Sequence, residues 1–340
     1  MIKTNKTHQP AIGVVGAGSW GTALAILLAR NGISVKLWDR DAEHIGQMVR
    51  GRTNQRYLPD VQLPDPISPL ADLPAALEDA DYVLIAVPSS GFRSVLQRVR
   101  TQVGSSFNLI WASKGLEPGT GKFLHQVVDE ELPEHRSIAV LSGPSFAKEV
   151  ARGLPTAVTI ASKNTAYAKA VAALFHCHRF RTYTSEDVLG VELGGSIKNV
   201  LAIAAGISDG LGYGANARAA LITRGLAEIM RLGKKLGGHR ETFMGLAGVG
   251  DLVLTCTDDQ SRNRRLGLAV GRGVALDQAV AEIGQAVEGL HTAKEVDELA
   301  RSHQVDMPIT QQVKRVLYDG EEAAAAVDAL LAREPKAENL

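Results

Sequence analysis

One lysine stands alone in a long apolar stretch near the middle of the chain. Between Glu192 and Asp209 the only charged side chain is Lys198, set in the sequence GGSIKNVLAIAAG. Lysine is seldom fully buried, because removing an ammonium group from water is costly unless a partner compensates. Lys198 therefore either extends its charged end to water along an apolar helix, or serves as an acid and base whose pKa is lowered by burial.

Donors suited to a phosphate group cluster in a second stretch, SRNRR at 261–265. Ser261, Arg262 and Asn263 could bind a phosphate dianion, although an arginine cluster is more often a solvated loop. The glycines around Asp251 in the preceding GVGD indicate a close approach of the backbone. Lys and Arg (37) balance Asp and Glu (37), so no overall field attracts nucleic acid or an anionic membrane, and a phosphorylated metabolite would need such a local cluster.

A glycine pattern near the start of the chain is typical of dinucleotide binding. Gly16, Gly18 and Gly21 fit G-x-G-x-x-G between an apolar run at 11–15 and a helix-like stretch that stops at Gly32. The first glycine permits a tight turn, the second lets the backbone approach a pyrophosphate, and the third allows close packing of the helix. Strand, glycine turn and helix in this order predict a bound NAD or NADP.

Coenzyme choice depends on the end of the next predicted strand, where Asp39 and Arg40 stand side by side. An acidic side chain there can accept hydrogen bonds from the adenosine ribose and favours NAD. A guanidinium there can pair with the additional phosphate of NADP. The two signals conflict, so both coenzymes are expected.

The elements that must position these residues alternate along the first half of the chain. Short runs rich in apolar residues at 11–15, 34–38, 82–87, 107–113, 137–143 and 156–162 are predicted strands, with mixed or amphipathic segments between them. A further strand is predicted near 180–183. This pattern predicts a doubly wound α/β Rossmann domain over 1–187, and the helical texture that follows predicts an all-helical domain over 188–340. Lys114, Gly143 and Ser145 come just after predicted strands, where ligands of such sheets bind.

Composition limits the remaining possibilities. A chain of 340 residues exceeds what one core usually supports, and 45% hydrophobic residues can form such cores. Two distant cysteines, Cys177 and Cys256, form no metal-binding spacing and favour a reducing compartment. No signal-peptide core begins the chain, and no apolar run approaches the length of about 20 residues that a membrane helix needs. We expect a cytoplasmic protein without metal, nucleic-acid partner or integral membrane segment.

Six motifs, taken in order, resemble those of bacterial-type NAD(P)-dependent glycerol-3-phosphate dehydrogenases. They are GAGSWGTALA, WASKGLE, SGPSFAKE, GLPTAV, ELGGSIKNVLAIAAGISDGLGYGANARAALITRGLAE and GLAGVGDLVLTCTDDQSRNRR. The resemblance extends over roughly residues 11–320. It implies a cleft between a Rossmann domain and a helical substrate domain. It also implies reduction of dihydroxyacetone phosphate with NADP or NAD, to supply glycerol 3-phosphate for phospholipid synthesis, and leaves room for a homodimer.

The matched motifs also imply roles for individual residues. By resemblance, Lys198 is the proton donor and acceptor. The residues around glycerol phosphate would be Lys114, Gly143, Ser145, Lys198, Asp251, Ser261, Arg262 and Asn263. Those at the coenzyme would be Gly16, Gly18, Ser19, Trp20, Gly21, Arg40, Lys114, Ala147, Arg262, Ala286 and Glu288.

Two other functions fit parts of the sequence. A Rossmann dehydrogenase for another hydroxy acid would share the glycine turn and even a lysine, but its carboxylate substrate gives no reason for SRNRR. A coenzyme sensor without catalysis would keep Gly16–Gly21 but has no need of Lys198 in apolar surroundings.

Overall fold

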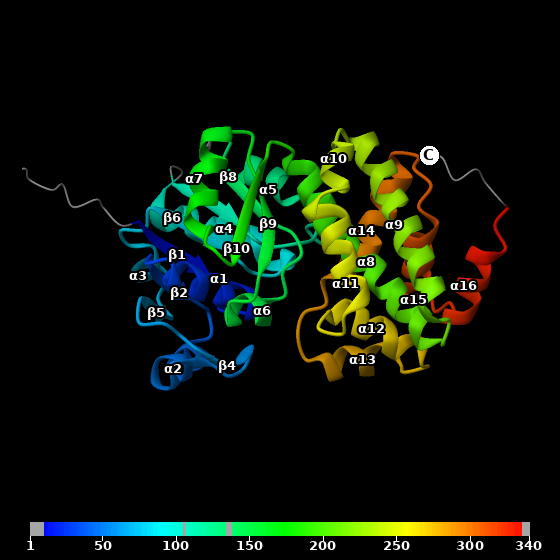
Figure 1. The fold of residues 1–340 in the computed structure, drawn as a ribbon, viewed down its shortest axis with the longest axis horizontal. Coiled ribbons are helices and arrows are strands. Elements are labelled where there is room, and N and C mark those ends of the chain that lie inside the picture. The colour runs from blue at the N-terminus through cyan, green and yellow to red at the C-terminus, as the bar shows by residue number, and fades with distance from the viewer. Residues whose placement is uncertain (1–9, 105–106, 134–137, 335–340) are drawn as a thin grey trace, which may run out of the picture.

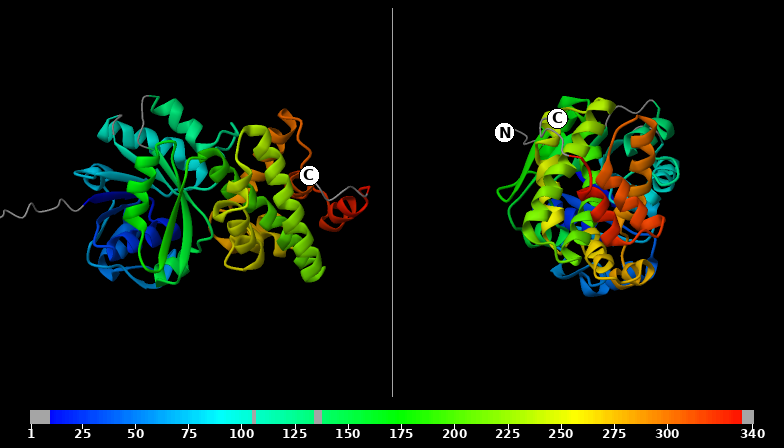
Figure 2. Two further views of the ribbon diagram at one scale, coloured as in Figure 1. Left: turned by 45° about the horizontal axis from the view of Figure 1, so that its top comes forward. Right: turned by 90° about the vertical axis from the view of Figure 1, so that its right-hand side faces the viewer.

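A computed structural model describes residues 10–104, 107–133 and 138–334. A half that contains the sheet and a half that is helical lie side by side along the long axis (Figures 1 and 2). The strands of the first half are β1 (Ala11–Val15), β2 (Ser34–Trp38), β3 (Thr53–Asn54), β4 (Leu58–Gln62), β5 (Ile67–Leu70), β6 (Tyr82–Ile85), β7 (Asn108–Trp111), β8 (Ile138–Ser142), β9 (Thr156–Ala161) and β10 (Phe180–Ser185).

Eight of these strands form one sheet in the order β10-β9-β8-β7-β6-β1-β2-β5, while β3 and β4 pair separately. The chain passes from β1 outward to β2 and β5, then crosses to β6 on the other side of β1. In register, Val14 of β1 lies between Leu37 and Leu84. The reversal of strand order between β1 and β6 is the switch point at which doubly wound sheets bind their ligands.

The sheet departs from the sequence expectation in two ways. β8 and β9 pair antiparallel, so β9 and β10 run against the other six strands. The edge strand β5 was not predicted, because Ile67–Leu70 is short and contains Pro69. Proline within a sheet occurs almost only on edge strands, which is where β5 lies. The seven predicted strands are present: β1 and β2 have the predicted bounds, β6 to β9 are shorter by one to three residues, and β10 extends two residues further. Position 137 lies outside the described residues.

Both faces of the sheet are covered by helices, because strand side chains alternate between them. Val14 and Leu84 face a core closed by α1 (Ser19–Arg30), α6 (Ala147–Arg152) and α7 (Thr165–Phe175), together with α2 (Ala42–Gly51). Val15 and Ile85 face a second core, closed by α3 (Leu73–Leu77), α4 (Ser89–Val103) and α5 (Leu124–Glu131). The first half is therefore a doubly wound Rossmann fold.

The helical half is built around α8 (Val188–Gly210), which other helices surround so that nearly all of its side chains are buried. The remaining elements are α9 (Gly214–Leu236), α10 (Arg240–Phe243), the π-helical turn η1 (Leu246–Gly250), α11 (Asp251–Thr257), α12 (Arg262–Gly271), α13 (Leu276–Ile283), α14 (Glu288–Ser302), α15 (Pro308–Tyr318) and α16 (Ala323–Leu331). By length and composition α8 could cross a membrane, contrary to the sequence expectation that no such run exists. Its most apolar window is 94% buried inside the protein, as in a core helix.

The carboxyl ends of five parallel strands share one edge of the sheet, and this edge meets the helical half. Gly16, Asp39, Ser89, Lys114 and Gly143 follow β1, β2, β6, β7 and β8 respectively. Hydrogen bonds from Lys114 to Asp251 and from Ser89 to Glu288 cross from this edge to the helical half. The fold thus brings the predicted site residues of both halves to one interface.

Candidate active site

Two lysines from different halves of the molecule share one buried carboxylate. Nζ of Lys198, on α8, lies 2.5 Å from Oδ1 of Asp251, the first residue of α11. Nζ of Lys114, three residues after β7, lies 2.8 Å from Oδ2 of the same carboxylate. The side chain of Asp251 is 1% exposed and those of Lys198 and Lys114 are 8% and 14% exposed. Lys198 therefore does not extend its charged end into water.

Further hydrogen bonds fix both ammonium groups. Lys198 also donates to Oγ1 of Thr255 over 3.1 Å, and Thr255 in turn donates to the backbone carbonyl of Asp251. Lys114 donates to the carbonyl of Gly143 over 2.9 Å, and this carbonyl also accepts from Ser145 Oγ. The two lysines are thus oriented by the loop after β8 and by the first turn of α11.

The cluster of Lys114, Asp251 and Lys198 carries one net positive charge. Burial lowers the pKa of Lys198 from 10.5 to about 8, an effect that Lys114 reinforces and Asp251 opposes. An ammonium group with a pKa in this range can give up its proton near neutral pH and take it back. The excess positive charge in a dry site favours an anionic ligand or a developing oxyanion.

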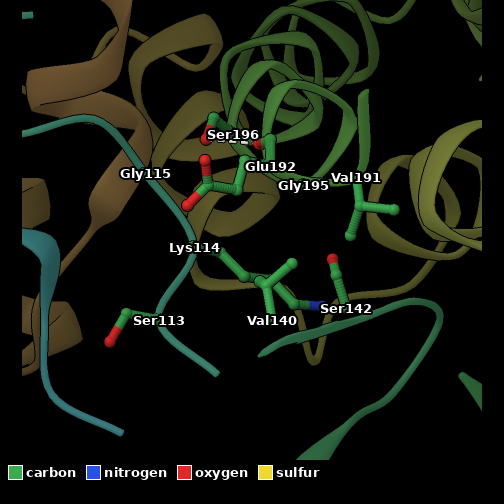
Figure 3. A pocket seen from close by; sticks show the side chains of 9 residues that line it. All are labelled: Ser113, Lys114, Gly115, Val140, Ser142, Val191, Glu192, Gly195 and Ser196. Carbon is green, nitrogen blue, oxygen red and sulfur yellow. Dashed lines mark hydrogen bonds between the residues drawn. The ribbon is translucent and has the colours of Figure 1, made fainter. Parts of the chain in front are cut away.

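A small cavity lies beside Lys114. Its volume is about 10 Å³, roughly the space for one water molecule. Figure 3 shows the side chain of Lys114 lying between α8 residues and the end of β8. Ser142 Oγ is buried here without a hydrogen-bond partner among the described residues.

The SRN motif forms the first turn of α12. Ser261 caps the helix and accepts from the backbone N–H of Arg264. Asn263 is buried, donating to Asn199 and accepting from the backbone N–H of Gly289. Arg262 is half-buried, and its guanidinium donates no hydrogen bond within the described part of the chain. Of the three predicted phosphate donors, the structure leaves Arg262 the least engaged.

The arginine that follows plays a different part. Arg264 is buried and pairs with Asp209 at 2.5 Å and with Asp259 at 2.9 Å. The pair with Asp209 holds the start of α12 against the end of α8. One arginine of the SRNRR cluster therefore belongs to the scaffold.

The glycine turn after β1 has the geometry that a dinucleotide requires. Gly16 has φ +116°, and a Cβ on Gly21 would lie 1.9 Å from the carbonyl oxygen of Gly16. A Cβ on Gly18 would meet open space, which leaves the N-terminus of α1 accessible to a pyrophosphate. Ser19 and Trp20 begin α1 beside this turn. These residues fit NAD(P).

Asp39 and Arg40 after β2 are engaged differently. The carboxylate of Asp39 accepts from the backbone N–H of Ala17 in the glycine turn and from that of Asp41, each over 3.1 Å. Arg40 is exposed. Asp39 therefore supports the turn, and Arg40 presents its charge at the position expected for the adenosine ribose.

The last three predicted coenzyme residues are spread over three elements. Ala147 begins α6, while Ala286 is exposed in the loop before α14. Glu288 begins α14 and accepts from both Oγ and the backbone N–H of Ser89, over 2.7 and 3.3 Å. Burial raises the pKa of Glu288, although Ser89 and Arg262 oppose this effect. Glu288 thus connects the two halves next to the site.

Sequence reasoning missed several polar residues in this arrangement. Thr255 lies four positions after Asp251, the helical spacing that places both on one face, and this spacing could have identified it. Ser89 follows a predicted strand and Pro88, again a recognisable position. Asn199, next to Lys198, gave no separate signal, because its contact with Asn263 depends on how α8 and α12 pack.

Comparison with known proteins covers nearly the whole chain. The family model for the N-terminus of NAD-dependent glycerol-3-phosphate dehydrogenase matches residues 11–168, and that for its C-terminus matches 187–328. A glycerol-3-phosphate dehydrogenase [NAD(P)+] of Thioalkalivibrio sulfidiphilus is 60% identical over 97% of this chain and 99% of its own length. That of Nitrosococcus oceani is 57% identical over 96% and 94%. The crystal structure of glycerol-3-phosphate dehydrogenase from Coxiella burnetii matches with a TM-score of 0.93 and 49% identity, covering 96% of this chain and 99% of that one.

Proposed function

The chain belongs to the NAD-dependent glycerol-3-phosphate dehydrogenase family, and we propose that its Lys198–Asp251–Lys114 cluster carries the reaction. The protein is an NAD(P)-dependent oxidoreductase that interconverts dihydroxyacetone phosphate and sn-glycerol 3-phosphate. Its product supplies phospholipid synthesis. The observation that supports the role of the cluster is the buried Lys198 ammonium, held 2.5 Å from Asp251.

Reduction of the ketone needs a hydride at the carbonyl carbon and a proton on its oxygen. Bound NAD(P)H supplies the hydride. The Lys198 ammonium stabilises the negative charge that develops on the oxygen and then donates its proton there. In the reverse direction neutral Lys198 accepts the proton of the hydroxyl group. Asp251 orients Lys198, and Lys114 adds a second positive charge.

The substrate phosphate is assigned to the start of α12. The Arg262 guanidinium binds it through a pair of hydrogen bonds, and the N-terminus of this 10-residue helix adds favourable partial charge. Ser261 and Asn263 hold that turn in place and contact the ligand beside Arg262. Gly143 and Ser145 line the glycerol side with Lys114.

The coenzyme is assigned to the edge of the sheet next to this site. Gly16, Gly18, Ser19, Trp20 and Gly21 hold its pyrophosphate at the start of α1, and Arg40 holds its adenosine end. The nicotinamide side is assigned to Lys114, Ala147, Arg262, Ala286 and Glu288, because their elements meet where the two halves join.

We further propose that the chain divides into domains at 187/188, since β10 ends at Ser185 and α8 begins at Val188.

A cytoplasmic location is supported by two free cysteines, one of them buried. A homodimer is proposed from the resemblance alone, and light scattering after size exclusion tests it.

The direct test follows the absorbance of NADH or NADPH upon addition of dihydroxyacetone phosphate. We expect oxidation of the coenzyme with this substrate and far less with unphosphorylated dihydroxyacetone, which lacks the group that Arg262 binds. Turnover of 2-oxo acids in place of the phosphate would instead favour the hydroxy-acid alternative. Coenzyme binding without turnover of either would favour the sensor.

A further inference from the structure

A buried glutamate joins the two halves without taking part in the proposed reaction. Glu192, in the second turn of α8, is 6% exposed. One carboxylate oxygen accepts from Nε1 of Trp111 and from the backbone N–H of His125, each over 3.1 Å. The other pairs with Nδ1 of His125. A buried carboxylate is costly unless several donors satisfy it, and here all three donors come from the Rossmann half.

Glu192 and Trp111 each stand close in sequence to one lysine of the cluster. Glu192 precedes Lys198 by six residues on α8, and Trp111 precedes Lys114 by three residues at the end of β7. Bonds that fix Glu192 to Trp111 therefore fix the helix that carries one lysine to the strand that carries the other.

The packing beside this pair leaves little room for adjustment. Glu192, Gly195 and Lys114 line the same small cavity (Figure 3). A Cβ on Gly195 would lie 3.7 Å from Cγ of Lys114 and 2.8 Å from Oγ of Ser142. A side chain at position 195 would thus contact both Lys114 and Ser142. Because α8 carries Lys198 and lies this close to Lys114, a shift of the helix changes the distance between the two lysines.

We propose that Glu192 is a positioning residue, with His125 as its partner, which sets the approach of Lys198 to Lys114 across the interface. The inference rests on the proposed function, since it concerns the geometry of that same site. It assigns Glu192 no contact with substrate or coenzyme.

The charges around the pair make the arrangement sensitive to pH. His125 is faced by Glu192 from α8, by Asp129 from its own helix and by Lys163 from the loop after β9. Burial lowers the pKa of His125, but the bond to Glu192 and the charges of Glu192 and Asp129 outweigh burial and raise it. The pair is therefore ionic at acid pH and stays ionic above the pH at which an ordinary histidine loses its proton.

The test is kcat for dihydroxyacetone phosphate reduction by Glu192→Gln, divided by the parent's kcat at each pH between about 6 and 8. An amide can still accept from Trp111, but its NH₂ group faces His125 and cannot pair with the protonated ring. We expect kcat to fall about tenfold at the acid end and the ratio to recover toward higher pH, with the coenzyme KM unchanged. A ratio near one throughout, or one that is constant with pH, would overturn the proposal.

Two further variants keep the test decisive. Glu228→Gln alters another buried glutamate of the helical half, which caps α15 through Ile309 and Thr310. It should change the pH dependence of stability while leaving kcat unchanged. If Glu192→Gln fails to fold, His125→Gln replaces it, since the half-buried ring can be changed with less disruption. Its kcat relative to the parent should also be lowest at the acid end, where the parent has the ion pair, and a ratio that is constant with pH would again overturn the proposal. Parent turnover of dihydroxyacetone phosphate tests the proposed function separately.

Discussion

At the residue scale, Arg262 and Arg40 differ in burial, and their loss should have different consequences. Arg262 is half-buried beside Glu288, and burial lowers its pKa. Arg40 is exposed after β2. In the proposed function the first binds the substrate phosphate in a partly dry site, and the second binds the coenzyme phosphate at the surface.

Replacement of Arg262 should weaken phosphate recognition. We expect Arg262→Ala to raise KM for dihydroxyacetone phosphate strongly, and Arg262→Lys to restore it only in part, because an ammonium group lacks the planar pair of donors. Steady-state kinetics measures both. The neighbouring exposed Arg265→Ala is the matched control, and an equal effect at both positions would point to general electrostatics rather than to a phosphate site.

Replacement of Arg40 should change coenzyme preference. Arg40→Ala is expected to weaken use of NADPH more than that of NADH, by roughly 1.5 to 3 kcal/mol for a lost charge-assisted hydrogen bond. The comparison is kcat/KM for the two coenzymes. Equal losses would mean that the adjacent phosphate of NADP does not reach this side chain.

Residue types and the family resemblance together predicted part of this site. Residue types singled out Lys198, the resemblance grouped it with Lys114 and Asp251, and the three side chains lie together in the structure. The capping role of Ser261 and the bonds of Asn263 to Asn199 and Gly289 were not foreseen. These depend on which elements pack against α12, and a local motif does not encode them.

At the element scale, strongly apolar strands and long helices were predictable, and strand direction was not. β6 to β9 have the apolar runs that mark them, whereas β10 is mostly polar. The reversal at β8–β9 is decided by how the intervening α6 connects them, since no residue of Thr156–Ala161 differs in kind from those of a parallel strand. Alternation of buried side chains is the same in both directions.

One buried contact between elements should govern the pH dependence of stability. Glu228 on α9 accepts from the backbone N–H groups of Ile309 and Thr310 at the start of α15. Burial raises the pKa of Glu228 from 4.5 to about 7, despite these bonds. Between these values the folded protein holds a proton that the unfolded chain releases, so the free energy of unfolding falls as pH rises.

The effect of Glu228 should amount to roughly 3 kcal/mol over this interval, and Glu228→Gln should remove it. Urea unfolding midpoints at several pH values between about 5 and 7.5 measure the slope. Exposed Glu298→Gln is the matched control and should keep the parent's slope. If Glu228→Gln also kept it, the pH dependence would have to arise elsewhere.

At the scale of the whole molecule, the site exists only because the two halves meet. Lys114 and Asp251 are 137 positions apart, and Ser89 and Glu288 are 199 apart. The sequence could predict two domains and a cleft through the family resemblance. The buried ion pairs across the interface could be found only from the fold, because their partners lie on different domains.

The pKa of Lys198 sets a pH dependence for the complete enzyme. With a pKa of about 8 in the folded protein, Lys198 is protonated below that pH and neutral above it. We expect kcat/KM for dihydroxyacetone phosphate reduction to fall as pH rises through about 8, and that for glycerol 3-phosphate oxidation to rise, because the two directions need opposite protonation states. If kcat/KM for both directions rose together or fell together with pH, this assignment would be contradicted.

The most direct measurement is turnover by Lys198→Met, which keeps most of the apolar stem and removes the charge. With dihydroxyacetone phosphate and saturating NADH or NADPH, kcat should fall by about 10²- to 10⁴-fold or more. The coenzyme dissociation constant should stay near that of the parent. The melting temperature shows that the variant is folded. A folded Lys198→Met protein that binds coenzyme normally and turns over within about threefold of the parent, only about 0.65 kcal/mol of barrier, would show that Lys198 is not the acid and base.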